Sequence, residues 1–318
     1  MSVSVKADNV NSSNLYLHVP ANHHARQRVL VVGEVLWDLF PDSVRLGGAA
    51  LNFAAHTKRL QHQPLLISAV GRDELGEEAA RAITTLGLDT SFLQITERFK
   101  TGTASVQLGP CDQTSFVIER PAAYDAVELS DSQIQQIISW QPDWFYYGTL
   151  FPSSVAGKDV LDRLFQAVPQ ARRLYDLNLR PASDSPDLVS ELLRQANVVK
   201  LNEEELKPVH TFTGLPPETE EFCRAGIERY GWDAVCVTLG ARGCAMLAGG
   251  EYVEAGGHRV DVADTVGAGD AFAAAFMHGI ASNWPTAEIA EFSNRVGALV
   301  ASVHGAIPNW TIEEVVDL

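Results

Sequence analysis

Short apolar runs alternate along the chain with longer segments in which apolar residues recur every three or four positions. The short runs are nearly continuous in aliphatic and aromatic residues, which is typical of strands buried on both faces. The pattern predicts an α/β fold with a mostly parallel sheet covered by helices on both faces. We expect strands at residues 29–32, 65–70, 144–147, 173–177, 198–201 and 234–239, and helices at 48–60, 75–86, 131–140, 155–168, 188–195, 219–230, 268–282 and 288–303.

Residues 92–119 break this alternation. They contain segments of period two, such as residues 103–108, which Gly109-Pro110 interrupts, and no helical stretch. We expect a small antiparallel β lid outside the main sheet, formed largely by about residues 92–120. A lid would keep water away from a reactive phosphate donor. An edge hairpin without a function is the alternative.

The charge balance limits the partners of the protein. The net charge is −16 at pH 7, and the isoelectric point is about 4.9. Nucleic acids and anionic membranes attract clustered Lys and Arg, so this composition argues against both as partners. Any phosphate must be bound locally, by backbone N–H groups, a few basic side chains and metal ions.

The ends and the cysteines indicate a cytoplasmic protein. Residues 1–28 are polar and lack the apolar centre of a secretion signal, so we expect an extension before a domain at 29–318. No apolar run approaches the ~20 residues that span a bilayer. Four cysteines lie far apart without C-x-x-C spacing, as is typical of buried thiols in a reducing compartment. They are Cys111, Cys223, Cys236 and Cys244.

Polar residues and two glycines lead directly into an Ala-rich helical segment at residues 261–276. Gly267 and Gly269 allow close approach of a bound group, because neither carries a Cβ. The free N–H groups of the first helical turn favour an anion there, typically a phosphate. Asp270 lies inside this cradle, and its natural task is to take a proton from a hydroxyl that attacks phosphorus. Alternatively, Asp270 only balances the helix dipole and the glycines only form a turn.

A second pair of glycines opens the first expected helix. Asp38 precedes Gly47 and Gly48, and Asn52 follows them. A carboxylate acceptor and a mixed donor–acceptor amide suit adjacent hydroxyls of a polyol. The G-x-G-x-x-G pattern of a dinucleotide site is absent after the first strand. The alternative makes Asp38 a loop residue and Asn52 an amide of the helix interior.

Three polar residues alternate at the end of a mid-chain strand. Extended geometry puts Asp176, Asn178 and Arg180 on one face, and Pro181 favours extended backbone at Arg180. The guanidinium could bind substrate or phosphate oxygens in bidentate fashion. A structural Asp–Arg pair is the alternative.

Two further strand ends carry weaker signals. Asn202 is followed by three glutamates, residues 203–205, which could hold hydrated Mg²⁺ or only cap a helix. Thr238, Gly240 and Gly243 fit a loop under nucleotide phosphates, or a simple turn.

Taken in order, these motifs resemble the PfkB, or ribokinase-like, carbohydrate kinases over residues 29–310. Runs at residues 33–38, 100–104 and 121–125 look most like the fructokinase branch. The matching motifs are Gly-Gly-x-x-x-Asn at 47–52, Asp-x-Asn-x-Arg at 176–180, Asn-x-x-Glu at 202–205, Thr-Leu-Gly-x-x-Gly at 238–243 and Asp-Thr-x-Gly-Ala-Gly-Asp-x-Phe at 264–272.

The resemblance implies an ATP- and Mg²⁺-dependent sugar kinase with a ribokinase-like fold. It makes Asp270 the base and Gly267, Ala268 and Gly269 the anion hole. The other implied site residues are Asp38, Gly48, Asn52 and Arg180 for the sugar, Asn202 and Glu205 for phosphate and Mg²⁺, and Thr238, Gly240, Gly243 and Asn294 for the nucleotide.

Many relatives are also activated by a monovalent cation, and their lids often pair between subunits. The resemblance therefore suggests K⁺ and a homodimer formed through the lid. The residues that match the cation site, several through backbone carbonyls, are Asp264, Val266, Val300, Val303, Gly305 and Asn309.

The chain departs from its relatives at a few positions. Gln61 replaces a usual glycine, Arg72 is less usual, and Ala49 stands where ribokinases have lysine, which argues against ribose. Fructose is the leading substrate, and 2-keto-3-deoxygluconate is the alternative, with Arg180 meeting its carboxylate. A nucleoside kinase is a weaker alternative, because it would not explain the fructokinase-like run at residues 33–38. If the protein is not an enzyme, the alternative is a catalytically silent protein that binds a sugar or a nucleotide.

Overall fold

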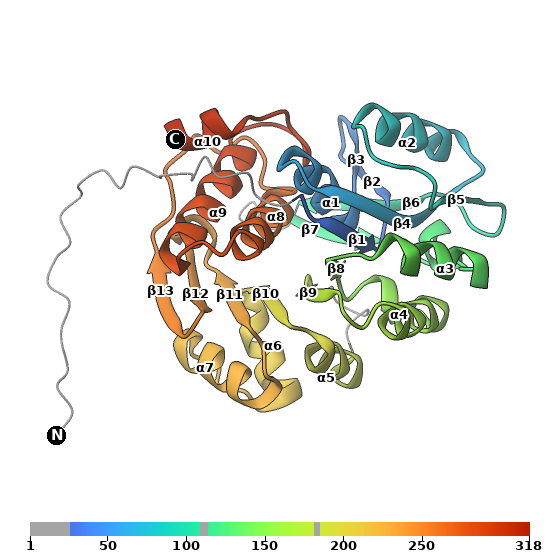
Figure 1. Cartoon of the computed structure of the whole chain (residues 1–318). Helices are drawn as coiled ribbons and strands as arrows, with labels where there is room; N and C mark the ends of the chain where they lie inside the picture. Colours follow the sequence, from blue (N-terminus) through green and yellow to red (C-terminus); the bar gives the residue numbers. More distant parts are fainter. Residues whose placement is uncertain (1–25, 109–113, 181–184) are drawn as a thin grey trace, which may run out of the picture.

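The alternating strands and helices of this chain form a large central sheet with helices on both faces (Figure 1). The structure, a computed structural model, describes residues 26–108, 114–180 and 185–318, without the side chains of residues 106–116. Residues 1–25 of the expected extension, Gly109-Pro110, Cys111 and Pro181 thus lie outside the described residues.

Nine strands of the described residues form the main sheet, in the order β13-β12-β11-β10-β9-β8-β1-β4-β5. All neighbours pair in parallel except at β12, which is antiparallel to both β11 and β13. These strands are β1 (Arg28–Val32), β4 (Gln63–Gly71), β5 (Leu93–Thr96), β8 (Trp144–Tyr147), β9 (Arg172–Asp176), β10 (Val198–Asn202), β11 (Ala234–Thr238), β12 (Cys244–Ala248) and β13 (Glu251–Ala255).

Strand β1 lies where the order of the sheet reverses. The chain runs from β1 to β4 and β5 on one side, and later from β8 to β11 on the other. Connections leave in opposite directions at such a point, so a crevice opens beyond the carboxyl ends of the strands. The ends of β1 and β8 are thus the expected place for a ligand.

Ten helices of the described residues cover the two faces of this sheet (Figure 1). Side chains from α1, α2, α8, α9 and α10 join one apolar cluster, and those from α3 to α7 join the other. The helices are α1 (Ala49–Arg59), α2 (Glu74–Thr85), α3 (Asp131–Trp140), α4 (Val155–Ala167), α5 (Pro186–Gln195), α6 (Glu203–Thr213), α7 (Thr219–Tyr230), α8 (Ala268–Ala281), α9 (Thr286–Ala301) and α10 (Ile312–Asp317).

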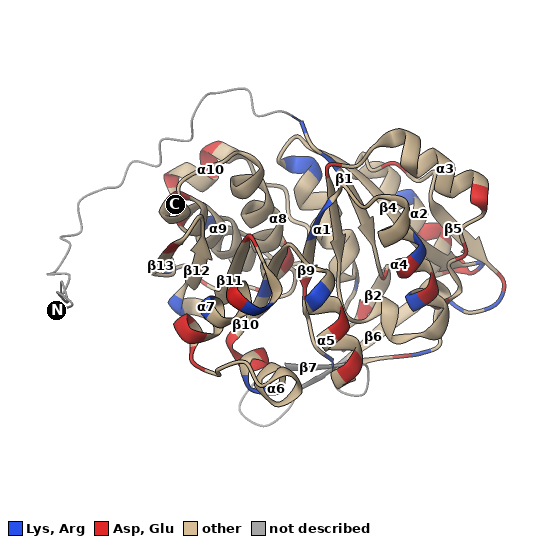
Figure 2. Cartoon of the chain, turned by 60° about the horizontal axis from the view of Figure 1, so that its bottom comes forward, with Lys and Arg blue, Asp and Glu red and all other residues tan. Residues whose placement is uncertain are grey.

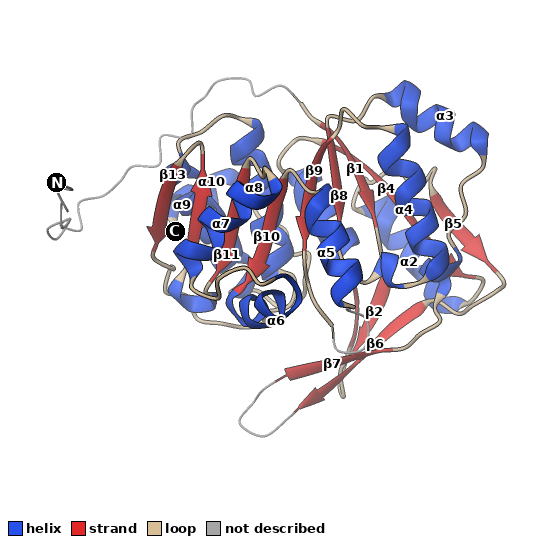
Figure 3. Ribbon diagram, turned by 90° about the horizontal axis from the view of Figure 1, so that it is seen from below, coloured by secondary structure: helices blue, strands red, loops and turns tan. Residues whose placement is uncertain are grey.

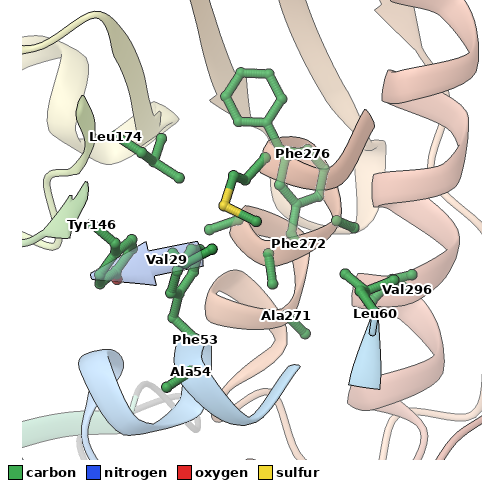
Figure 4. Close-up of a cluster of buried hydrophobic side chains, with 14 of the residues drawn as sticks. Val29, Phe53, Ala54, Leu60, Tyr146, Leu174, Ala271, Phe272, Phe276 and Val296 are labelled. Carbon is green, nitrogen blue, oxygen red and sulfur yellow. The ribbon is translucent and has the colours of Figure 1, made fainter. Parts of the chain in front are cut away.

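Alternation along β1 shows why the strands are apolar throughout. Val29 and Val31 pack into the first cluster, whereas Leu30 and Val32 pack into the second. Figure 4 shows the first cluster, in which Phe53 of α1 and Tyr146 of β8 lie beside Val29, and Phe272 and Phe276 of α8 lie close by. The rings of Phe53 and Tyr146 stack with centroids 3.8 Å apart. This packing fixes α1 and α8 relative to the centre of the sheet.

A second sheet forms the lid, and its composition differs from our expectation. The order is β3-β2-β6-β7, with β2 (Leu36–Leu39), β3 (Val44–Gly47), β6 (Gly102–Leu108) and β7 (Thr114–Ile118). The sequence assigned the lid largely to about residues 92–120, but β5 pairs with β4 in the main sheet, and β2 and β3 complete the lid. It projects from the main body (Figure 3). Strands β6 and β7 pair antiparallel, as expected for this region, and β2 joins β6 in parallel.

Acidic and basic residues are interspersed along the helices (Figure 2). Glutamates and aspartates outnumber Lys and Arg by 40 to 24 in the whole chain. Within the described residues, no helix has both the length and the apolar character needed to cross a membrane.

Candidate active site

Two cavities meet at the N-terminus of α8. The first, of about 230 Å³, lies beyond the ends of β1 and β8, at the reversal point of the sheet, and is walled by lid residues. The second, of about 570 Å³, lies between α8, α9 and the loop after β11. Thr265 and Gly269 line both cavities. A group bound in one therefore faces a group in the other across the start of α8.

Asp270 lies in the first turn of α8 and lines the first cavity. Only 9% of its surface is exposed, and its Oδ2 accepts a hydrogen bond from Asn52 Nδ2 at 2.8 Å. Burial, together with the nearby Asp176 carboxylate, raises the pKa of Asp270 to about 7, although Asn52 and Lys200 lower it. A carboxylate with this pKa takes up a proton readily near neutral pH, as a general base requires.

A buried ion pair lies directly beneath this turn. Lys200 Nζ is 3.0 Å from Asp176 Oδ1, and both side chains are at most 4% exposed. A Cβ added to Gly269 would lie 3.3 Å from Lys200 Nζ. The ammonium thus sits close behind the start of α8. Lys200 was not assigned a role from the sequence, although a lysine inside an apolar strand was a signal that could have found it.

The glycine that begins α8 has no room for a side chain. Gly267 has φ +80°, and a Cβ there would lie 2.5 Å from Ala306 O. The first N–H groups of a helix have no acceptor within it, so those of Ala268 and Gly269 are placed to meet an anion. Ala268 N–H also donates to Thr265 O at 3.3 Å. The geometry therefore fits the anion hole expected at residues 267–269.

The residues expected to hold a polyol meet in the first cavity. Asp38 lies on β2 and Asn52 on α1, and both line it, as does Gly48. A Cβ on Gly47 would lie 2.7 Å from Asp38 Oδ2 and 4.0 Å from Asn52 Oδ1, so the two side chains face the same spot. Burial and the Asp264 carboxylate raise the pKa of Asp38 to about 6. Asp38 lies on a strand and is therefore not the loop residue of the alternative, whereas Asn52 is an amide of the α1 interior that also lines the cavity.

Glu34 is a residue of this cavity that the sequence did not assign. It is 8% exposed, and its Oε1 accepts the N–H of Ala49 at 3.1 Å. Burial raises the pKa of Glu34, although its bonds to backbone N–H groups oppose this. Glu34 fixes the start of α1, and hence the position of Asn52. Its place directly after the first strand was the available signal.

The Asp-x-Asn-x-Arg motif divides at the end of β9. Asn178 and Arg180 line the first cavity, but Asp176 lies beneath it, paired with Lys200. Asn178 has φ +44°, so the extended alternation that would bring all three to one face ends there. Asp176 therefore pairs with Lys200 and not with Arg180, as the alternative had expected.

The second cavity contains the residues expected to hold a nucleotide. Thr238, Gly240, Gly243 and Asn294 all line it, together with Phe272. Asn294 Nδ2 donates to Ala255 O and Gly256 O, at 3.3 and 3.1 Å. The volume of this second cavity, about 570 Å³, is in the range of small-molecule sites.

Asn202 and Glu205 form a capping box at the start of α6. Asn202 Oδ1 accepts the N–H of Glu205 at 3.1 Å, and Glu205 Oε2 accepts the N–H of Asn202 at 2.8 Å. Glu205 Oε1 accepts the N–H of Leu179 at 2.7 Å. The helix-capping interpretation is thus realised, and a contribution to Mg²⁺ binding stays a prediction.

The residues expected around a monovalent cation come from two neighbouring segments. Asp264 accepts the N–H of Val266 at 3.0 Å and that of Gly305 at 3.2 Å. Val300 lies in the last turn of α9, and its carbonyl oxygen accepts the N–H of Val303. Asn309 Oδ1 accepts a hydrogen bond from Arg59 at 2.8 Å.

Comparisons with known proteins find relatives over most of this chain. A fructokinase of Escherichia coli is 29% identical over 300 residues, which cover 88% of this chain and 95% of the relative. The solved 2-dehydro-3-deoxygluconokinase of Thermotoga maritima has a TM-score of 0.80 at 20% identity, over 91% of this chain and 98% of that one. The fructokinase of Xylella fastidiosa, solved with bound ATP, has a TM-score of 0.77 at 22% identity, over 91% and 97%. These two structures support the fold.

The family comparison covers nearly the whole chain. The family described as pfkB family carbohydrate kinase matches residues 27–312, which include both cavities and the lid. The chain therefore belongs to the pfkB family of carbohydrate kinases, phosphotransferases that act on a sugar hydroxyl.

Proposed function

We propose that this protein transfers the γ-phosphoryl group of ATP to a hydroxyl of fructose. One observation carries the proposal: Asp270 and the N-terminus of α8 separate a small polar cavity from a larger one lined by glycines. The sugar occupies the first cavity and the nucleotide the second. The attacking hydroxyl and the terminal phosphate then meet at Thr265 and Gly269, which belong to both.

In the transfer, the sugar hydroxyl loses its proton to Asp270 as its oxygen forms a bond to the γ-phosphorus. The bond from that phosphorus to the bridging oxygen of ADP breaks, and the electron pair stays with ADP. The N–H groups of residues 267–269 stabilise the charge on the transferred group. The N-terminal end of the α8 dipole acts in the same sense.

The second cavity suits ATP because its glycines leave room for the base and ribose. Thr238, Gly240, Gly243 and Asn294 would hold the nucleotide. Mg²⁺, when bound, neutralises phosphate charge. Glu205 fits that ion through water, because both of its oxygens already accept backbone N–H groups.

Two orphaned polar atoms support a neutral polyol as substrate. Among the described residues, neither Asn52 Oδ1 nor Asn178 Nδ2 has a hydrogen-bond partner, although both are buried. An acceptor and a donor left in this way suit sugar hydroxyls, since burying them unpaired costs about 1–3 kcal/mol each. Glu34, Asp38 and Asp270 line the same cavity, and their carboxylates disfavour an anionic substrate. The E. coli fructokinase is consistent with this choice.

A 2-keto-3-deoxygluconate kinase is the second candidate, and Arg180 favours it. Its guanidinium lines the first cavity, and the hydrogen bond that it makes within the described residues is to its neighbour's carbonyl, Leu179 O, at 3.1 Å. It is therefore available to a substrate carboxylate.

A coupled kinase assay over a panel of sugars tests both proposals. We expect turnover with fructose and much less with 2-keto-3-deoxygluconate or nucleosides. If the keto-deoxy acid is used instead, Arg180→Met should raise its KM strongly and leave the KM for ATP nearly unchanged. Lack of turnover with every sugar, while ATP still binds, would support a silent binding protein.

We also propose a cytoplasmic homodimer. Three cysteines of the described residues are free and buried, as suits a reducing compartment. The lid sheet ends in β3 and β7, which expose Val44 and Val117 at about half of their surface. Unpaired strand edges with apolar side chains are suited to pairing with a second copy.

A further inference from the structure

The cation site suggested by the sequence depends on one negative charge, that of Asp264. The carbonyl ligands expected beside it carry only partial charges. Asp264 lies in the loop that leads into Gly267 and α8, and its side chain is about 10% exposed. Whatever neutralises this carboxylate therefore stands close to the anion hole.

Both oxygens of Asp264 already have donors. Oδ1 accepts the N–H of Val266 at 3.0 Å, and Oδ2 accepts the N–H of Gly305 at 3.2 Å. The guanidinium of Arg45 also forms an ion pair with Oδ2. The expected ligand Asn309 is engaged as well, through its Oδ1 and Arg59. A potassium ion at Oδ2 would have to displace the guanidinium, and one at Oδ1 would lie close to that positive charge.

Arg45 is held firmly in this position. It lies on β3, directly across from Asp38 of β2 in the lid sheet. Its guanidinium lies over the ring of Phe40, 4.6 Å from the centroid, and the side chain is 30% exposed. An arginine side chain keeps its charge at any physiological pH. A cation beside Asp264 would face this fixed positive charge and be repelled by it.

We propose that Arg45 takes the place of a monovalent cation beside Asp264, so that the kinase works without potassium. This inference rests on the proposed kinase activity. Arg45 touches neither reactant in this arrangement and acts as a positioning residue. Through Asp264 it ties the loop of Val266 and Gly267 to the loop at Gly305, and it does so from the lid.

The test compares kcat and KM in potassium, sodium and choline chloride at equal ionic strength, with ATP as its Tris salt. The wild-type rates should agree within about twofold, because the three salts screen charges alike. Arg45→Met should lose kcat in choline chloride by about ten- to a hundredfold, less than loss of a direct oxyanion donor costs. Potassium should restore part of it. Arg45→Lys, which keeps the charge, should stay indifferent to potassium.

A second readout does not depend on turnover. Potassium should raise the Tm of Arg45→Met relative to choline chloride, because an ion that binds only the folded state stabilises it. The Tm of the wild type should be the same in both salts. A folded Arg45→Met that responds to potassium in neither assay would refute the replacement.

The potassium dependence of the wild-type protein tests the proposal even if Arg45→Met does not fold. Turnover that falls at least about tenfold in choline chloride and returns with potassium would overturn the proposal. Failure of the proposed kinase activity looks different, since no sugar would then be phosphorylated in any salt.

Discussion

Replacing Gly267 by alanine should damage both the fold and the reaction. The added Cβ would lie 2.5 Å from Ala306 O and 2.6 Å from its Cα and Cβ, and φ is +80°. The left-handed backbone costs alanine about 1–2 kcal/mol. Overpacking adds about 1–3 kcal/mol. We therefore expect the free energy of unfolding to fall by about 2–5 kcal/mol.

The same clash displaces the N–H groups that follow Gly267. Losing one oxyanion donor lowers kcat by about 10²–10³-fold, so we expect a loss in this range. Steady-state kinetics measures kcat, and urea denaturation measures stability. Gly231→Ala is the matched control: its φ is +72°, but nothing lies within 4 Å of the added Cβ. It should lose only the backbone term and keep its kcat. If Gly267→Ala kept more than half of the wild-type kcat, our placement of the anion hole would be refuted.

Three further predictions concern charge and assembly. Because the pKa of Asp270 is raised to about 7 and a base must be deprotonated to act, kcat/KM for the sugar should fall about tenfold per pH unit below pH 7. A flat profile of kcat/KM down to about pH 5.5 would contradict this. Lys200→Met leaves Asp176 buried without its cation, so the free energy of unfolding measured in urea should fall by about 3–5 kcal/mol. Lys200→Met combined with Asp176→Asn should lower it clearly less, and equal losses would disprove the coupling. Val44→Lys combined with Val117→Lys should make the protein monomeric in analytical ultracentrifugation, and a dimer that survives both changes must use another surface.

The sequence predicted six of the nine strands of the main sheet, because these strands are largely buried on both faces. It did not predict β12 and β13, and it placed β5 in the lid. Runs such as residues 29–32 are apolar throughout, and the expected parallel order follows from the helices between them. Ser130 followed by Gln133 is a pattern typical of a helix start, and the two residues do form a capping box at α3, with Ser130 N–H donating to Gln133 Oε1 at 3.0 Å. Such local signals depend on neighbours in the chain, so sequence alone suffices.

The lid was harder to predict because strand pairing depends on distant partners. Residues 93–96 look like the strands after them, yet β5 joins β4 through the register of Ser68 with Leu93. Short strands such as β2 and β3 carry little periodicity. Only the tertiary structure shows that they complete the lid.

Site residues could be predicted where the charge of a side chain is unfavourable in its sequence context. Asp270 within a phosphate cradle is such a case, and the structure places it beside Asn52. Lys200 and Arg45 were missed because their partners, Asp176 and Asp264, are distant in the chain. The sequence could not show that these cations compete with the roles expected for Asp176 and for a bound metal ion.

The most direct test of the account is the turnover of Asp270→Asn, measured together with its affinities for ATP and sugar. Asparagine keeps the size of the side chain but cannot accept the proton, so kcat should fall by about 10²–10⁴-fold. Calorimetric Kd values for both ligands should stay close to those of the wild type. Asp261→Asn, which changes an exposed carboxylate in the same stretch, should keep full activity. If Asp270→Asn turned over at nearly the wild-type rate, another group would be the base and the central claim would be wrong.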